Sequence, residues 1–162
     1  TGELIVRGPQ VMAGYLDDGD ATAKVIRDGW LFTGDIATYD TDGYFKIVDR
    51  KKDLIKTSGY NVFPIEIEEA VRKLAGVSDV AVVGVPDVEK GELVKAYIIP
   101  KPESGLTVAT VEQFCRTHLA KHKQPRQIEL CTELPRNFLG KVLRRRLRET
   151  PEESAAKTGE KS

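Results

Sequence analysis

An aspartate preceded by Thr33 and Gly34 is the first residue along the chain whose setting suits ligand chemistry. Asp35 lies at an expected loop between strands, where a carboxylate can accept two hydrogen bonds from a vicinal diol such as the ribose of a nucleotide. Charge-assisted hydrogen bonds of this kind contribute ~1.5–3 kcal/mol each. Taken alone, Thr-Gly-Asp is explained better by an aspartate that only caps a turn.

Two basic residues could act with Asp35 on an anionic ligand. Arg50 follows it fifteen residues later and offers a planar set of donors for hydroxyls and phosphates, although a surface ion pair also explains it. Lys141 ends the loop Pro135-Arg-Asn-Phe-Leu-Gly140-Lys141, from which a lysine can reach a phosphate or a carboxylate as a point charge. Gly-Lys before a helix is common, so this loop alone is weak evidence for a functional lysine. It supports a ligand site only together with the other motifs.

Metal and nucleic-acid sites are not supported by the sequence. His118 and His122 have the i, i+4 spacing of zinc ligands on an expected helix, but no Glu or Cys completes a set, and an ordinary helix face explains them better. The acidic turn Asp40-x-Asp42-Gly43 favours a hairpin over a calcium loop. The basic run at residues 141–148 has no interleaved aromatic residues, so we interpret most of it as a solvated helix face.

The elements that must position these residues change character at the charged run of residues 49–53. Before it, we predict strands at residues 3–7, 36–40 and 44–48, and a loop at 17–20. After it, the expected elements are a helix from Pro64 to Gly76, strands at residues 80–85 and 93–99, a helix capped by Thr107, a strand at 128–131 and a basic helix at 143–149. The pattern predicts an α+β fold with a central mixed sheet flanked by helices.

Composition and charge favour a soluble globular protein. The 162 residues include 25 Lys+Arg and 25 Asp+Glu, so the formal net charge is zero and nucleic acid is not an expected partner. No apolar run approaches the ~18 residues of a membrane helix. Cys115 and Cys131 are too few for a disulfide framework, which fits a reducing cytoplasm. Because the chain begins at Thr1 inside an expected strand and has its only methionine at Met12, we expect a segment of a longer protein.

Four sequence blocks, taken in order, resemble the C-terminal part of the acyl-adenylate-forming (AMP-binding) enzymes. This superfamily includes acyl-CoA synthetases, the adenylation domains of peptide synthetases and beetle luciferases. The blocks are Gly2-Glu3-Leu4-Ile5 through Val11-Met12-Ala13-Gly14-Tyr15-Leu16, Thr33-Gly34-Asp35, residues 49–68, and Pro135-x-x-x-x-Gly140-Lys141. Within the superfamily, the chain is most similar to medium- and long-chain fatty acyl-CoA ligases in the sequences of four segments, at residues 47–53, 58–62, 114–116 and 140–145.

This resemblance implies a division of the chain. Residues 1–49 would be the end of the β-barrel of a large N-terminal AMP-binding domain, residues 50–52 the hinge, and residues 53–150 a small C-terminal lid domain. Residues 151–162, which lack large apolar side chains, would be a disordered tail. The phosphate loop, the magnesium ligands and the fatty-acid tunnel would precede Thr1. We therefore expect no metal site in this chain and no ligase activity from it alone.

The resemblance also implies roles in adenylation, in which a fatty acid reacts with ATP and magnesium to form an acyl-adenylate. Asp35 and Arg50 would hold the ribose of ATP. Ile47 would pack near the nucleotide, although an ordinary core residue of a strand explains it equally well. Lys52 would be the pivot of the hinge. Lys141 would be the catalytic residue that approaches the α-phosphate and the substrate carboxylate.

A second half-reaction with CoA would follow rotation of the lid domain about the hinge. The loop Ser58-Gly59-Tyr60 would then face the acyl-adenylate, and Lys56 would make a further contact. Gly59 would let the backbone pass close to the pantetheine arm of CoA, although a turn glycine with positive φ explains it equally well. Leu139 departs from the small hydroxyl residue often found before Gly-Lys.

Two alternatives stay open. The chain could be the lid of an adenylation domain that serves a carrier protein, although the polar tail argues against a following thiolation domain. It could also be a non-catalytic binding or regulatory module of the same fold, against which the presence of Asp35, Arg50 and Lys141 argues. For the ligase, the expected partners are fatty acid, ATP, CoA and the N-terminal domain of the same chain. We expect a cytoplasmic protein with no transmembrane segment, and its peripheral association with a membrane stays open.

Overall fold

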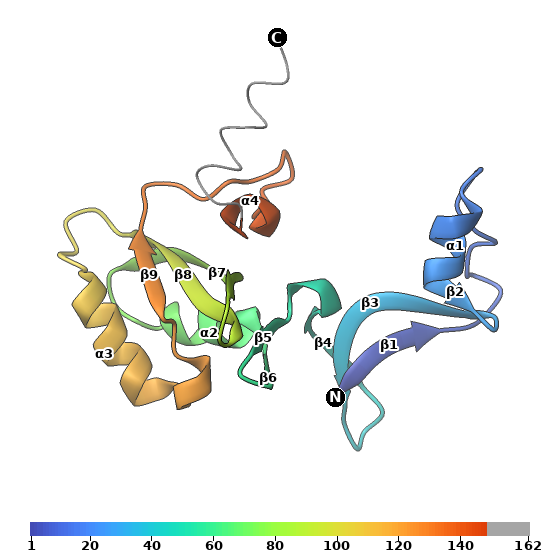
Figure 1. Ribbon diagram of the computed structural model, residues 1–162, viewed down its shortest axis with the longest axis horizontal. Coiled ribbons are helices and arrows are strands. Elements are labelled where there is room, and N and C mark those ends of the chain that lie inside the picture. Colours follow the sequence, from blue (N-terminus) through green and yellow to red (C-terminus); the bar gives the residue numbers. More distant parts are fainter. Residues whose placement is uncertain (149–162) are drawn as a thin grey trace, which may run out of the picture. The chain divides into compact units, whose positions relative to one another are not determined.

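A computed structural model describes residues 1–148 and divides the chain into two units, with the boundary between Lys52 and Asp53 (Figure 1). A short 3-10 turn, η1 (Lys51–Asp53), carries the chain across that boundary. Within residues 1–148, no helix is long and apolar enough to span a membrane.

The first unit is a four-stranded antiparallel sheet organised around one long strand. The strands are β1 (Gly2–Val6), β2 (Ile26–Arg27), β3 (Trp30–Tyr39) and β4 (Phe45–Arg50). β3 pairs with each of the other three. The hairpin predicted between β3 and β4 is confirmed, because the Asp40 carboxylate accepts hydrogen bonds from the backbone N–H groups of Asp42 (3.0 Å) and Tyr44 (2.9 Å).

A short helix, α1 (Gly19–Val25), lies where the sequence pattern predicted only a loop. Its start is fixed by Asp18, whose carboxylate accepts a hydrogen bond of 2.8 Å from the backbone N–H of Ala21. Aspartate is a favoured residue at this capping position because it satisfies an N–H group that has no partner inside the helix. The cluster of Asp and Gly at residues 17–20 was therefore a helix start, and the prediction of a loop there was wrong in part.

The first unit has very little hydrophobic core of its own. Within residues 1–52, Ala37 is the only apolar residue that is buried. Large apolar side chains are instead exposed on its strands and on the hairpin: Ile5, Trp30, Tyr39, Tyr44, Phe45 and Ile47. That these residues end a larger barrel, with a hinge at residues 50–52, stays a prediction.

The second unit contains a five-stranded mixed sheet, which confirms the predicted α+β class. The strands lie in the order β6 (Tyr60–Val62), β5 (Ile55–Thr57), β8 (Gly91–Pro100) and β7 (Val77–Asp87), and β9 (Gln127–Leu130) pairs in parallel with β8. The helical segments are α2 (Pro64–Val71), α3 (Val108–His118), η2 (Lys121–Lys123) and α4 (Arg144–Arg148). The predicted cap of α3 is confirmed, since the Thr107 hydroxyl accepts a hydrogen bond from the Thr110 N–H.

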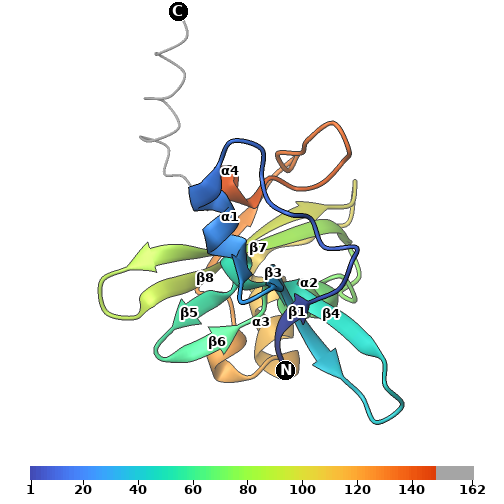
Figure 2. The ribbon, with the colours of Figure 1, turned by 90° about the vertical axis from the view of Figure 1, so that its right-hand side faces the viewer.

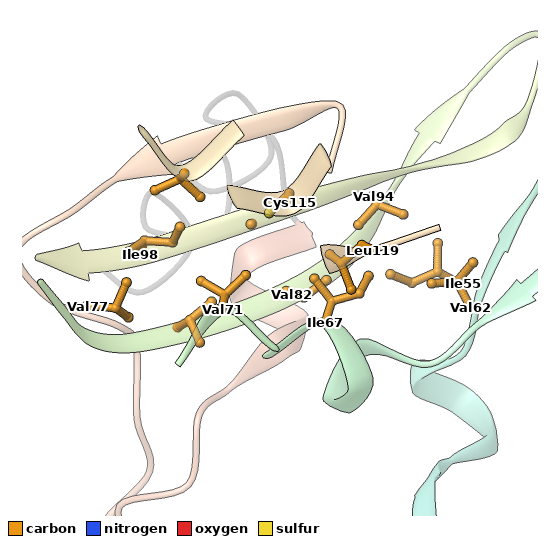
Figure 3. Close-up of a cluster of buried hydrophobic side chains, with 13 residues drawn as sticks. Ile55, Val62, Ile67, Val71, Val77, Val82, Val94, Ile98, Cys115 and Leu119 are labelled. Atoms are coloured by element: carbon orange, nitrogen blue, oxygen red, sulfur yellow. The ribbon is translucent and has the colours of Figure 1, made fainter. Parts of the chain in front are cut away.

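Both faces of this sheet are buried, and successive residues of β7 point to opposite faces. Val80 and Val82 belong to a cluster covered by α2 and α3, where Cys115 is only 2% exposed (Figure 3). Ala81 and Val83 pack on the other face with Leu134 and with Leu147 of α4. Figure 1 shows α3 and α4 on opposite sides of the sheet. Burial on both faces explains why β7 reads as a continuous run of Val and Ala rather than as an alternating strand.

The free edge of β7 is closed by side chains of α2. Glu68 is 3% exposed, and its Oε1 accepts a hydrogen bond of 2.9 Å from the backbone N–H of Val82. Arg72, which follows the last residue of α2, donates from Nη2 to the backbone oxygen of Val80 (3.4 Å). These contacts satisfy groups that an edge strand would otherwise present to another chain.

Two arginines of α4 meet buried carboxylates. Arg144 donates to Oε1 of Glu68 (2.7 Å) and lies 3.9 Å from Oδ2 of Asp53, and Arg148 lies 3.4 Å from Oδ1 of Asp53. The interpretation of the basic run as a solvated face was therefore wrong for these two residues. The sequence pattern does not reveal these ion pairs, because the arginines and the acidic residues lie far apart along the chain. The predicted last residue of the helix, Glu149, and the predicted tail at 151–162 lie outside the described residues.

Replacement of Glu68 by alanine should destabilise the second unit strongly. The change removes the acceptor of the Val82 N–H and one of the two buried carboxylates that Arg144 meets, and breaking a buried charge pair from one side costs about 3–5 kcal/mol. Chemical denaturation measures the loss. Glu69→Ala is the matched control, because Glu69 is the exposed neighbour on the same helix. A loss for Glu68→Ala no larger than that for Glu69→Ala would contradict the structural role.

The two cysteines should react slowly with thiol reagents in the folded protein. Burial, with a smaller effect of Glu112, raises the pKa of Cys115 from 9.0 to about 11, and burial also raises the pKa of Cys131. For Cys115 this reduces the thiolate fraction at pH 8 about a hundredfold. Labelling with a chromogenic disulfide, with and without denaturant, measures this difference in the reactivity of the thiols.

The pKa of Cys115 also makes stability depend on pH. Because unfolded Cys115 ionises near pH 9.0 and the folded thiol does not, its contribution to the free energy of unfolding should fall as the pH rises from 9.0 toward 11.

Candidate functional site

Thr33, Gly34 and Asp35 form a bulge in β3. The pairing of β3 with β1 runs from Glu3 opposite Ile36 to Ile5 opposite Phe32, so these three residues oppose one residue of β1. Gly34 has a φ of 73°, in the left-handed region that favours glycine. The Thr33 hydroxyl donates to the backbone oxygen of Leu4 (2.8 Å) and accepts from the N–H of Asp35 (3.1 Å). Each residue of the motif thus has a structural task in orienting Asp35.

Asp35 and Arg50 lie directly opposite each other on β3 and β4. The Nε of Arg50 is 3.2 Å from Oδ1 of Asp35. The side chains are 31% exposed for Asp35 and 56% exposed for Arg50. The surface ion pair considered for Arg50 is therefore present in the structure. Its partner is Asp35, the residue expected to bind the ribose. Because both side chains reach solvent, a ligand with hydroxyl and phosphate groups can bind to the pair without first opening a buried contact.

A cavity of about 360 Å³ adjoins this pair and is lined by Thr33, Gly34, Arg50, Lys51 and Lys52. Three of the five lining residues are cationic, which suits an anionic ligand. Lys51 is also paired with Glu3 at 2.7 Å. Ile47 is not among the lining residues, and 51% of it is exposed, so it is not a core residue of this unit. Of the predicted residues, Arg50 and Lys52 thus line this cavity, Asp35 is joined to it by its ion pair with Arg50, and Ile47 does not line it.

The loop at residues 58–59 is a two-residue turn that joins β5 to β6. Ser58 and Gly59 both have positive φ values, 49° and 81°, which is typical of the type I′ turn of a β-hairpin. The Ser58 N–H donates to the backbone oxygen of Lys90 (2.9 Å) and so ties this turn to the β7–β8 hairpin, beside which it lies in Figure 2. A Cβ added to Gly59 would meet no atom within 4 Å. The left-handed backbone therefore accounts for glycine here, and the space around it is open.

A second cavity, of about 260 Å³, lies beside this turn. Its walls come from the turn, from Lys90 and from the segment around η2: Thr57, Ser58, Tyr60, Lys90, Val94, Lys121, His122, Gln124 and Arg126. The lining includes three cationic side chains and no acidic one. Lys56 is not part of it; its side chain is exposed and its N–H donates to Glu92 (2.7 Å). Lys90, Lys121 and Arg126 were not identified from the sequence, because only the tertiary fold brings them together.

His122 stacks on Tyr60 in this cavity, with ring centroids 4.5 Å apart and an interplanar angle of 17°. His118 stacks instead on Phe114 of its own helix, at 4.0 Å. The prediction that both histidines lie on one helix was wrong, because α3 ends at His118 and His122 belongs to η2. Among residues 1–148, no group of His, Cys, Asp and Glu could hold a metal ion.

Lys141 stands at the end of a loop that is held closed by Asn137. The Asn137 Oδ1 accepts hydrogen bonds from the N–H groups of Leu139 (3.0 Å) and Lys141 (2.9 Å), and the Asn137 N–H donates to the Lys141 oxygen (2.9 Å). Gly140 has a φ of 78°. Lys141 is exposed, and none of the described residues pairs with its ammonium group. The loop therefore has a fixed backbone and presents one available cation.

Known proteins of similar sequence and structure share this arrangement of elements. Residues 66–141 match the model of the AMP-binding enzyme C-terminal domain family. Over 148 residues the chain is 53% identical to the long-chain-fatty-acid–CoA ligase of Salmonella typhimurium, covering 91% of this chain and 26% of that protein. It is 46% identical over 153 residues to the Bacillus subtilis ligase of the same name, covering 94% of this chain and 27% of the relative.

Solved structures agree with these similarities. The ATP-bound MatB of Rhodopseudomonas palustris superposes with a TM-score of 0.88 at 38% identity, over 94% of this chain and 31% of that one. A fatty acyl CoA synthetase of Mycobacterium tuberculosis has a TM-score of 0.67 at 36% identity, over 96% of this chain and 30% of the other. The chain spans about a quarter of the length of the curated relatives it matches.

Proposed function

Since the chain belongs to the AMP-binding enzymes and carries their C-terminal domain, we propose that it serves an ATP-dependent fatty acid–CoA ligase. The family predicted from the four sequence blocks is confirmed. The observation that carries the proposal is the Asp35–Arg50 pair beside a cavity with cationic walls, in a chain about half identical to such ligases. Most of the enzyme would lie outside this chain, including the ligands of magnesium and the binding site of the fatty acid.

In the first half-reaction, a carboxylate oxygen of the fatty acid attacks the α-phosphorus of ATP, and the bond to pyrophosphate breaks. Asp35 would accept hydrogen bonds from the ribose hydroxyls, and Arg50 would assist it. Lys141 would approach the α-phosphate and the carboxylate. Two anions must meet in this step, so a positioned cation lowers the barrier by stabilising the charge that develops.

In the second half-reaction, the sulfur of CoA attacks the acyl carbonyl carbon, and AMP leaves as the thioester forms. The 58–60 loop would line the path of the pantetheine arm, after the lid domain has turned about a pivot at Lys52. The cavity beside this loop supports CoA as the thiol substrate, because Lys90, Lys121 and Arg126 offer cations to the phosphates of its nucleotide end. Lys56 would contact the ligand only in this second conformation.

Replacement of Lys141 by alanine in the full-length ligase should depress adenylation. Loss of one electrostatic contact to the transition state costs about 10²–10³-fold in kcat, whereas removal of an exposed side chain barely changes stability. Fatty-acid-dependent exchange of pyrophosphate into ATP measures the first half-reaction, and thioester formation from preformed acyl-adenylate measures the second. The second should stay near normal. Lys73→Ala, at an exposed lysine of the same unit, is the control, and unchanged exchange in Lys141→Ala would remove Lys141 from the mechanism.

Replacement of Gly59 by leucine should slow the CoA half-reaction selectively. The side chain would enter the space beside the cavity, and misplacing a reacting ligand costs about tenfold or more. The left-handed φ adds a strain of ~1–2 kcal/mol that is independent of any ligand. Gly43→Leu, in the β3–β4 turn at a φ of 92°, carries a comparable strain and should leave this half-reaction unchanged. Equal effects of the two changes would favour a turn glycine with no role toward CoA.

A further inference from the structure

Arg144 is the residue of α4 that lies closest in sequence to Lys141, three positions away. Its Nη2 lies 2.7 Å from Oε1 of Glu68, and its Nη1 lies 3.9 Å from Oδ2 of Asp53. Glu68 is 3% exposed and Asp53 is 8% exposed. One guanidinium therefore spans two buried carboxylates that come from α2 and from the first residue of the second unit.

The two carboxylates that meet Arg144 also have other partners. Glu68 accepts the N–H of Val82 in β7, and Asp53 is also met by Arg148. Ionic groups with so little contact with water are stable only when their geometry satisfies them, so this cluster has little freedom to rearrange. Arg144 is thus fixed against the sheet, α2 and the start of the unit together.

The loop that carries Lys141 is anchored at both ends, at its start by a partly exposed ion pair and at its end by Arg144. At its start, Arg136 pairs with Asp79 of β7 and also donates to the backbone oxygen of Gly140. At its end, the Leu143 N–H donates to the Pro135 oxygen (2.7 Å), and Arg144 follows at once. Arg144 is therefore one of the two anchors that set where the closed loop sits on the rest of the unit.

We propose that Arg144 is a positioning residue for Lys141, an inference that rests on the adenylation role proposed above. The Lys141 side chain is exposed and has no partner among the described residues, so its reach is set by the loop backbone alone. A displacement of about 1 Å costs on the order of a hundredfold in rate. Arginine is required because its planar fork can meet two carboxylates, whereas the single ammonium of lysine cannot hold both in the same geometry.

The test is a double-mutant cycle in the full-length ligase. Arg144→Lys, Lys141→Ala and the double variant are compared by pyrophosphate exchange and by thioester formation from preformed acyl-adenylate and CoA. Arg144→Lys should lower the kcat of exchange about tenfold or more and leave the second half-reaction near normal. In the Lys141→Ala background, the same change should cost nothing further, because Arg144 acts through Lys141.

Arg72→Lys is the matched control. Arg72 contacts the same Glu68 at 3.5 Å, but it directly follows α2 and does not belong to the Lys141 loop or to α4, so this change should leave exchange unchanged. Glu68→Gln is a second variant: it retains an acceptor for Val82, removes the charge that Arg144 meets, and should reproduce the selective loss. Unfolding midpoints are recorded for every variant.

The outcomes separate this inference from the proposed function. Equal loss of both half-reactions in Arg144→Lys, or an additive loss in the Lys141→Ala background, would show that Arg144 serves only the fold. Normal exchange in both Arg144→Lys and Glu68→Gln would overturn the inference as well. If Lys141→Ala alone left exchange unchanged, the proposed function would fail first.

Discussion

Glu68 places a carboxylate at the free edge of β7, where it has almost no contact with water, and much of the second unit depends on how that charge is met. It accepts a backbone N–H that the sheet leaves unpaired, and it receives Arg144 from a helix on the other side of the unit. A buried carboxylate without such partners would be costly enough to prevent this packing. The same contacts join the two helix layers across the edge of the sheet.

At the candidate ligand sites, by contrast, an irregular backbone orients exposed side chains. Gly34 and Gly59 both adopt left-handed φ values, one in a bulge of β3 and one in a tight hairpin turn. Asp35 and Tyr60 follow directly after these glycines. Functional side chains next to a fixed but irregular backbone can be aimed accurately while they stay accessible to a ligand.

The most reliable predictions from the sequence were those of local contacts, in which both partners lie within a few residues of each other. The Asp40 turn and the Thr107 cap are of this kind, whereas Asp18 was misjudged because Gly and Asp suit a loop and a helix start equally well. The contacts of the basic helix could not be predicted: the residues paired by Arg144 and Arg148 lie 76 and 95 positions away. The cationic cavity beside Tyr60 was missed for the same reason, since Lys90 and Lys121 meet only in the folded unit.

The ion pairs of α4 also bear on the order in which the chain can fold during synthesis. Asp53 and Glu68 leave the ribosome long before Arg144 and Arg148, so these two acidic residues are synthesised well before the two arginines that meet them in the folded unit. Contacts between the two ends of a domain form late, after the loop-closure entropy has been overcome. Docking of α4 therefore acts as a closing step, and translation that stopped before Arg144 would release a chain without the arginines that allow Asp53 and Glu68 to be buried.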